Sequence, residues 1–224
     1  MKNFFVLFSI VFLYACGGGG SGPVTDVDPP HTVLLDPPSG YHGSATLSFS
    51  FQADEDNCTF ECRLCPNTNC QNSTVSWQSC ISPVNYTVLS DGSQNFEVKA
   101  TDSAGNEEPH NPPHGGINWT LTVDLTDPEV TISESPDYIS GEIVGFAPFT
   151  ANFAYDGTDN YFVAEYWCRL TGLQNPVWEI CNGGAISYPD LPFGDYEFEV
   201  NVKDGAGNTS DNASFEFVVN QVFQ

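Results

Sequence analysis

The sequence has few basic residues and lacks the motifs of common enzyme classes. It contains five Lys and Arg residues against 29 Asp and Glu residues, so its formal charge at pH 7 is −24. A surface this acidic repels nucleic acid and anionic lipid headgroups. There is no Gly-x-Ser-x-Gly nucleophile elbow, phosphate-binding glycine loop or dinucleotide-binding glycine motif. These absences exclude a nucleic-acid partner, and we predict a protein that is not an enzyme and has no catalytic residues.

Long apolar segments are also missing, except at the N-terminus. Lys2 precedes a run from Phe4 to Tyr14 that is apolar apart from Ser9. As a helix this run would rise about 16 Å, roughly half of a hydrocarbon core, which is too short to span a bilayer. A basic residue followed by a short apolar run is typical of a secretory signal, which we place at residues 1–15.

The segment Leu13-Tyr14-Ala15-Cys16 resembles the lipobox of bacterial lipoproteins. The resemblance implies that Cys16 is acylated, for example with palmitate, and becomes the mature N-terminus; Gly17 implies sorting to the outer membrane. Two or more acyl chains would anchor the protein stably to the cell envelope, on its periplasmic or surface face. The alternative is an ordinary secretory signal cleaved nearby. Residues 16–28 are rich in Gly and Ser and predict a flexible tether.

Alternation of apolar and polar residues predicts β-strands along the rest of the chain. Leu47, Phe49 and Phe51 are separated by polar residues. The same pattern recurs at Phe96, Val98 and Ala100; at Phe149, Ala151, Phe153 and Tyr155; at Tyr196, Phe198, Val200 and Val202; and at Phe215, Phe217 and Val219. A period of two buries one face of each strand. No segment has a convincing 3.6-residue period, so we expect an all-β protein of antiparallel sheets stacked face to face.

The chain contains an internal repeat with an offset of about 100 residues, the size of one β-sandwich domain. The first copy comprises Cys62-Arg63-Leu64, Trp77, Cys80, Asp91-Gly92, Phe96, Val98 and Asp102-Ser103-Ala104-Gly105-Asn106. The second comprises Cys168-Arg169-Leu170, Trp178, Cys181, Gly194-Asp195, Phe198, Val200 and Asp204-Gly205-Ala206-Gly207-Asn208. We therefore predict two domains, residues 29–124 and 125–224. Pro29-Pro30 and Asp127-Pro128 mark their entrances, because proline cannot donate to a strand ladder.

The first copy, together with Ser82-Pro83, Tyr86 and Leu89, resembles the bacterial Ig-like repeats of secreted and surface proteins. The second copy is similar at the Cys-Arg-Leu, Trp, Cys and Asp-Gly-Ala-Gly-Asn positions, but it lacks the Ser-Pro and Asp-Gly elements. The resemblance implies two tandem immunoglobulin-like antiparallel β-sandwich domains. It also implies a non-catalytic module for display, adhesion or spacing at the cell surface, with an extracellular protein or glycan as partner.

Seven cysteines follow Cys16, which fits an oxidising compartment. The repeat pairs Cys62 with Cys80 and Cys168 with Cys181; loops of this size stabilise a fold by about 3 kcal/mol in the chain-entropy model. Cys65 and Cys70 flank turn-forming residues, so we pair them with each other. Cys58 is left as a free thiol or an intermolecular link.

The cysteine cluster also permits a different reading. Four thiolates at Cys58, Cys62, Cys65 and Cys70 could form a tetrahedral zinc site, in a metal-binding or enzymatic periplasmic protein. An oxidising compartment favours disulfides over this alternative. His110 and His114 are separated by two prolines that preclude a helix, so we interpret them as part of a solvated loop.

The Asp-x-Ala-Gly-Asn segments follow alternating strands and predict turns, because Asp and Asn bond their own backbone and Gly accepts positive φ. We expect no cofactor, and calcium is the alternative to a purely structural role for these turns. Asp102, Asn106, Asp124 and Asp127 could supply hard oxygens near the domain junction, although no EF-hand loop is present. For the partner, we expect that Tyr138, Tyr161 and Trp119, if clustered on one face, would indicate a binding patch.

Overall fold

The structure is a computed structural model that describes residues 25–66, 70, 74–109, 116–136, 144–146 and 148–220. Cys16, His110, His114 and Tyr138 lie outside these residues. In the described part of the chain, the named elements are the strands β1 to β16. The same residues contain no helix with the length and apolar character needed to cross a membrane.

The first domain is a sandwich of two sheets. Its strands are β1 (Thr32–Leu35), β2 (Tyr41–His42), β3 (Thr46–Ala53), β4 (Thr59–Pro66), β5 (Gln78–Cys80), β6 (Val84–Thr87), β7 (Gly92–Thr101) and β8 (Ile117–Val123). One sheet has the order β1-β3-β6 and the other β2-β8-β7-β4-β5. All neighbouring strands are antiparallel except β2, which pairs with β8 in parallel.

The second domain repeats this topology strand for strand. Its strands are β9 (Glu129–Glu134), β10 (Val144–Phe146), β11 (Phe149–Thr158), β12 (Val163–Thr171), β13 (Glu179–Ile180), β14 (Ala185–Leu191), β15 (Gly194–Asp204) and β16 (Ala213–Asn220). The sheets have the orders β14-β11-β9 and β10-β16-β15-β12-β13. The chain is thus all-β, with two tandem immunoglobulin-like sandwiches. The first ends with β8 at Val123 and the second begins with β9 at Glu129, on either side of Leu125.

Each core lies between the two sheets and is centred on a stacked pair of phenylalanines. Phe49 of β3 stacks on Phe96 of β7 with ring centroids 4.0 Å apart, and Phe153 of β11 stacks on Phe198 of β15 at 4.1 Å. All four side chains are buried. The alternating residues of the sequence therefore face one another across the sandwich, as the period of two predicts.

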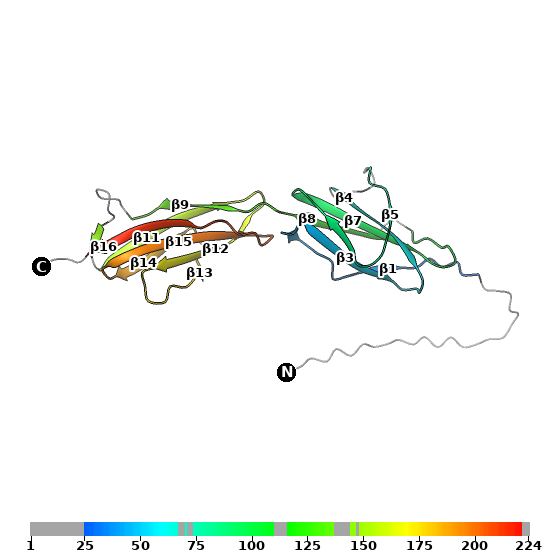
Figure 1. The fold of residues 1–224 in the computed structure, drawn as a ribbon, viewed down its shortest axis with the longest axis horizontal. Coiled ribbons are helices and arrows are strands. Elements are labelled where there is room, and N and C mark those ends of the chain that lie inside the picture. Colours follow the sequence, from blue (N-terminus) through cyan, green and yellow to red (C-terminus); the bar gives the residue numbers. More distant parts are fainter. Residues whose placement is uncertain are drawn as a thin grey trace, which may run out of the picture.

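The two domains follow one another along the long axis of the molecule (Figure 1). The described chain enters at one end of this axis, next to β1, and β16 leads to the C-terminus at the other end. Residues 124–128 connect β8 to β9 between the sandwiches. Each of β7 and β8 therefore has one end at the junction between the domains and the other end at the opposite pole of the first domain.

Three disulfides fasten the edges of the sheets. Cys62 bonds to Cys80, and Cys168 bonds to Cys181, each with Cα atoms 5.8 Å apart. These bridges tie the edge strands β5 and β13 to β4 and β12 within one sheet, whereas antibody domains bridge their two sheets. The third bond, between Cys65 and Cys70, closes a short loop after β4. The three pairs are those that the sequence predicts.

Replacement of Phe153 with Ala tests the core of the second domain. Phe153 is 1% exposed, so the change removes a stacked ring and leaves a cavity. We expect the free energy of unfolding to fall by about 3–5 kcal/mol, measured by urea titration with intrinsic fluorescence. Phe193→Ala is the control, because Phe193 is 63% exposed and its loss should change stability by about 0.5 kcal/mol or less. Equal effects of both changes would contradict this core.

Candidate functional site

The Asp-Gly-Ala-Gly-Asn turn after β15 holds the connecting segment between the domains. Asp204 Oδ1 accepts hydrogen bonds from the backbone N–H groups of Ala206, Gly207 and Asn208 at 2.6–2.8 Å. The Asn208 side-chain amide donates to Asp204 Oδ2 at 2.7 Å, and to the carbonyls of Asp124 at 2.9 Å and Thr126 at 3.2 Å. The turn thus acts as a clamp on residues 124–126.

The first domain has the same clamp at its outer pole. Asn106 donates to Asp102 Oδ2 at 2.8 Å, and to the carbonyls of Asp26 at 3.2 Å and Asp28 at 3.4 Å. Asp102 also accepts the backbone N–H of Asn106 at 2.8 Å. The sequence pattern correctly predicts a turn at both places. It does not reveal that the Asn side chain fastens the segment entering each domain, because the bonded carbonyls are about 80 residues away.

At the junction, Asp91 joins the first domain to the connecting segment and to the second domain. It lies in the turn before β7, and its Oδ1 accepts the backbone N–H of Leu125 at 2.6 Å. Its Oδ2 accepts the Thr126 hydroxyl and, at 2.9 Å, the side-chain amide of Asn160 from the β11–β12 loop. A single carboxylate therefore holds three donors from both sides of the domain boundary.

Aromatic and glycine residues bring the two domains into close contact. The Tyr41 ring meets the rings of Tyr161 and Phe162 edge-on, with centroids 5.1 Å apart in both pairs. Gly43, directly after β2, lies so close to the second domain that a Cβ there would be 2.9 Å from the carbonyl oxygen of Ala206. A Cβ at Gly205 would be 2.1 Å from the Phe162 ring. A larger residue at Gly43 would force the domains apart, and one at Gly205 would displace the Phe162 ring that packs against Tyr41.

Two groups of carboxylates accompany these clamps. The junction cluster consists of Asp124, Asp159 and Asp204, and the pole cluster of Asp26, Glu55 and Asp102; within each, one oxygen per residue lies within 4.8 Å of the others. The four candidate calcium ligands from the sequence are therefore not brought together. Asp102 and Asn106 lie at the outer pole and Asp124 at the junction, while Asp127 lines a separate groove beside β9.

The two clusters differ in electrostatics. Burial raises the pKa of Asp124, and the charges of Asp159 and Asp204 add to this, while hydrogen bonding to Thr126 and Asn160 acts in the opposite direction. At the pole, burial also raises the pKa of Asp102, but bonds from Asn106, Gly105 and Ala104 outweigh it and leave that pKa below its ordinary value. Negative charge is thus less well compensated at the junction.

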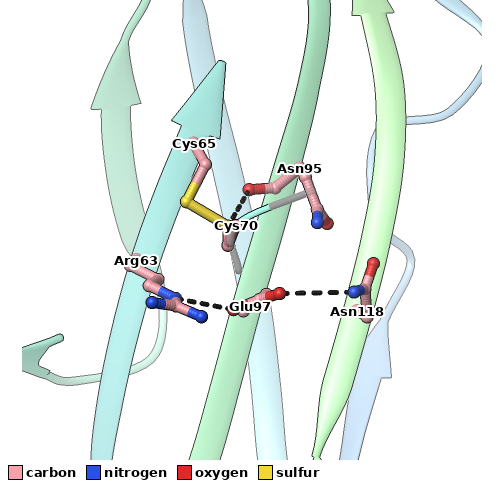
Figure 2. Close-up of a disulfide and its surroundings, with 6 residues drawn as sticks. All are labelled: Arg63, Cys65, Cys70, Asn95, Glu97 and Asn118. Carbon is pink, nitrogen blue, oxygen red and sulfur yellow. Dashed lines mark hydrogen bonds and ion pairs between the residues drawn. A yellow bond between two sulfur atoms is a disulfide. The ribbon is translucent and has the colours of Figure 1, made fainter. Parts of the chain in front are cut away.

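A second repeated constellation covers the outer face of each five-stranded sheet. Glu97 of β7 is 1% exposed and pairs with Arg63 of β4 at 2.6 Å, and Asn118 of β8 donates to its second oxygen at 3.3 Å (Figure 2). Figure 2 also shows the Cys65–Cys70 bridge above this pair, with Cys70 Sγ 3.7 Å from the carbonyl of Asn95. The Arg63 guanidinium lies 4.5 Å from the centre of the Trp77 ring.

The second domain has the same group, again made of an Arg, a Glu, an Asn and a Trp. Arg169 pairs with Glu199, which also accepts a hydrogen bond from Asn212 at 3.2 Å. The Arg169 guanidinium lies 4.7 Å from the centre of the Trp178 ring. The Arg and Trp of the sequence repeat are therefore structural partners. Glu199 of β15 and Asn212, the residue before β16, complete the group in the second domain.

Beyond this shared part, the second domain has a hollow that we call the tryptophan hollow. Its volume is about 350 Å³, and it is lined by Trp167, Trp178, Asn201, Lys203, Gly207 and Thr209. Trp167 of β12 is directly opposite Asn201 of β15, and its indole N–H donates to Glu165 at 3.1 Å. The sequence indicates Trp178 through the repeat, but Trp167 becomes visible as its neighbour only once β12 and β13 are in register.

Of the other aromatic residues named from the sequence, Tyr161 and Trp119 do not share a patch. Tyr161 packs against Tyr41 at the junction, whereas Trp119 lies in β8 and donates from its indole N–H to the carbonyl of Pro38 at 2.7 Å. The aromatic surface that distinguishes the second domain is the tryptophan hollow.

The cysteines of the first domain are arranged for bridging and not for thiolate coordination. Cys62, Cys65 and Cys70 are each in a disulfide, so only Cys58 of the proposed zinc set carries a thiol. Burial and the nearby charges of Glu55 and Asp102 raise the pKa of the Cys58 thiol. The reactive thiolate form is therefore scarce at neutral pH.

Comparisons with known proteins find one family model and several solved structures that are similar to this chain. The Y_Y_Y domain family matches residues 166–220, which run from β12 to the end of β16. Among solved structures, the fibronectin(III)-like modules of CbhA from Clostridium thermocellum are 13% identical with a TM-score of 0.47, over 85% of this chain and 94% of that chain. Domains A168–A170 of titin are 11% identical with a TM-score of 0.47, over 86% of this chain and 67% of that chain. No curated protein matches the sequence.

A thiol count distinguishes the disulfide arrangement from a zinc site. After denaturation without reductant, we expect alkylation of Cys58 alone among the cysteines beyond Cys16, because the other six are bridged. Mass spectrometry of the alkylated peptides gives the positions. Modification of Cys62, Cys65 and Cys70 in the same sample, with release of zinc, would support the metal alternative instead.

Replacement of Asn208 with Ala tests the clamp at the junction. The change removes the donor to the carbonyls of Asp124 and Thr126, so we expect a loss of roughly 1–2 kcal/mol and faster proteolysis between β8 and β9. Small-angle scattering should show a wider range of interdomain arrangements. Asn106→Ala is a matched control, because it removes the same contacts at the outer pole and should leave the junction intact. If both variants are cleaved equally between the domains, the clamp does not hold the junction.

Proposed function

We propose that this protein is a non-catalytic module of the bacterial cell envelope that binds a saccharide through the tryptophan hollow of its second domain. Acylation at Cys16 would anchor the chain to the outer membrane. The Gly- and Ser-rich residues that follow Cys16 would act as the tether, up to the Asp26 and Asp28 carbonyls that Asn106 holds.

 The hollow is the observation that carries this proposal.

The lining of the hollow has the chemistry that sugar recognition needs. The indole rings of Trp167 and Trp178 offer flat apolar surfaces against which the C–H face of a pyranose ring can stack. The Asn201 amide, the Lys203 ammonium and the Thr209 hydroxyl supply donors and acceptors for the sugar's hydroxyl groups. Aromatic walls with a few polar groups are typical of small-molecule sites.

The equivalent surface of the first domain is closed by charge pairs. Glu61 occupies the position of Trp167, Lys99 that of Asn201, and Glu107 that of Thr209, as the strand registers of the two domains show. Lys99 pairs with Glu61 at 3.1 Å and with Glu107, and it lies 5.1 Å from the centre of the Trp77 ring. The substitutions that remove these ion pairs are the ones that open the hollow in the second domain.

The arrangement of the domains suits presentation of this hollow away from an anchored N-terminus. The described chain enters the first domain at the end of the long axis that is farthest from the second domain (Figure 1). The clamps of Asn208 and Asp91 fix the connecting segment between the two domains. A lipid at Cys16 would therefore hold one end, with the hollow displayed one domain further out.

A passive spacer is the second candidate function, and the junction favours it. Hydrogen bonds from both domains to residues 124–126 and the packing of Tyr41 against Tyr161 make a defined connection, as a spacer requires. The two candidates share the anchor and the junction. They differ in whether the tryptophan hollow has a ligand.

A glycan screen with the full mature chain separates these candidates, using cell-wall polysaccharides and an array of soluble oligosaccharides. For a saccharide that binds, Trp167→Ala should weaken the affinity at least tenfold, which corresponds to about 1.4 kcal/mol of lost stacking. Isothermal titration calorimetry and quenching of tryptophan fluorescence provide the measurement.

Trp77→Ala is the matched control for this experiment. Trp77 stacks on Arg63 much as Trp178 stacks on Arg169, but the first domain has Glu61 where a second indole would be needed. The affinity of this variant should equal that of the unmodified protein. Absence of saccharide binding, or binding that survives Trp167→Ala, would overturn the proposal, and absence of any ligand would favour the spacer.

A further inference from the structure

The junction cluster places three carboxylates together, two of which are almost fully buried. Asp124 is 1% exposed and Asp204 is 2% exposed. Asp159 is half-buried and precedes Asn160 in the β11–β12 loop. One oxygen from each residue lies within 4.8 Å of the other two. Three negative charges at this separation repel one another strongly when water is excluded.

Two oxygens of the cluster have no donor. Asp124 Oδ2 and Asp159 Oδ1 are both inaccessible to water and accept no hydrogen bond, although buried polar atoms almost always find a partner. Asp204, by contrast, accepts three backbone N–H groups on one oxygen and the Asn208 amide on the other. The cluster therefore consists of hydrogen-bond acceptors, and two of its buried oxygens have no donor or cation to compensate their charge.

The lysines and arginines of the described residues do not supply that partner. Arg63 pairs with Glu97, Lys99 with Glu61 and Glu107, and Arg169 with Glu199, all on the outer faces of the five-stranded sheets. Lys203 lines the tryptophan hollow. A bound cation is therefore one way to compensate the charge of the junction cluster, and it would also give the two buried oxygens a partner.

We infer that Asp124, Asp159 and Asp204 bind a calcium ion that locks the junction between the two domains. Ca²⁺ takes six to eight oxygen ligands in flexible geometry and accepts carboxylates in one- or two-oxygen modes, so three carboxylates with waters or carbonyls satisfy it. Thiolate and imidazole, which softer metals prefer, are absent from the cluster. This inference does not depend on saccharide binding.

The ion acts on the junction because its ligands come from different segments. Asp124 belongs to the connecting segment, Asp159 to the β11–β12 loop and Asp204 to the turn after β15. Asn160, next to Asp159, donates to Asp91 of the first domain at 2.9 Å. Holding Asp159 in place therefore also holds the hydrogen bond that crosses the domain boundary.

The pole cluster is a natural internal control. It has the same clamp of Asn106 on the carbonyls of Asp26 and Asp28, but Asp26 is exposed, and none of its carboxylate oxygens is both buried and without a donor. Among the described residues, the conditions that point to an ion are met at the junction alone. We therefore assign the calcium site to the junction cluster and not to its counterpart.

Calorimetric titration of the EDTA-treated mature chain with calcium chloride tests the assignment, with Asp124→Asn and Asp26→Asn compared in parallel. Both replaced carboxylates accept the same type of bond, from the backbone N–H of Thr126 and of Asp28 respectively. We expect saturable binding that weakens at least tenfold in Asp124→Asn and is unchanged in Asp26→Asn. Absence of saturable binding, or equal binding by Asp124→Asn and the unmodified protein, would overturn the assignment.

Thermal unfolding gives a readout that a merely structural role of Asp124 cannot reproduce. In EDTA, Asp124→Asn should raise the melting temperature, because it removes one of three repelling charges. In calcium, the same variant should melt below the unmodified protein, because it has lost a ligand. An effect of the same sign in both conditions would count against the site, and circular dichroism confirms that the variant is folded.

Terbium luminescence locates the ion. Tb³⁺ replaces Ca²⁺ at oxygen sites and is excited by a nearby tyrosine, and Tyr161 donates its backbone N–H to Asp159 Oδ2 at 2.8 Å. Tyr161→Phe should reduce the sensitised emission while leaving calcium affinity unchanged. If emission does not fall in this variant, and calcium fails to displace the terbium, the bound ion lies elsewhere.

Discussion

The hydrogen bonds from Asn208 to the carbonyls of Asp124 and Thr126 are the constraint on which the junction depends. Asp124 donates its backbone N–H to the carbonyl of His42 in β2, but residues 125–128 belong to no strand, so their backbone groups must be satisfied by other means. Once Asn208 holds these carbonyls, Leu125 and Thr126 face Asp91 of the first domain, and the Asp124 side chain meets Asp159 and Asp204. One side-chain amide therefore sets the path of the chain, the contact between the domains and the grouping of the carboxylates.

The two arginines of this acidic protein both pair with glutamates of low exposure. Arg63 and Arg169 each support a glutamate on a sheet face, and an Asn and a Trp complete both groups. Burying an ion pair costs solvation free energy, which additional hydrogen bonds and cation–π contact offset. Removal of either arginine would leave a glutamate of low exposure without its charge partner, which is why these pairs recur in both copies of the repeat.

The sequence predicts the strands, the disulfides and the turns, because each depends on local periodicity or on a repeat. It does not predict which carboxylates meet. Asp102 and Asp124 are 22 positions apart, but β7 ends at Thr101 and β8 returns antiparallel to Val123, so they lie at opposite ends of the sandwich. At about 3.3 Å per residue, a strand of this length separates its ends by roughly 20–30 Å. Asp159 and Trp167 join their sites only through tertiary packing and register.

The two domains share a scaffold and differ where the shared structure places no demand. The clamp, the Arg–Glu pair and the stacked phenylalanines recur because each is needed to close a sandwich and to fasten its entering segment. Glu61, Lys99 and Glu107 satisfy one another on the sheet face, and the same three positions can be Trp167, Asn201 and Thr209 because no core contact depends on them. In the second domain, Phe193 occupies the position before β15 that Asp91 occupies before β7. The two copies of the repeat therefore differ at their surfaces. The first domain supplies Asp91 at the junction, and the second domain supplies the tryptophan hollow.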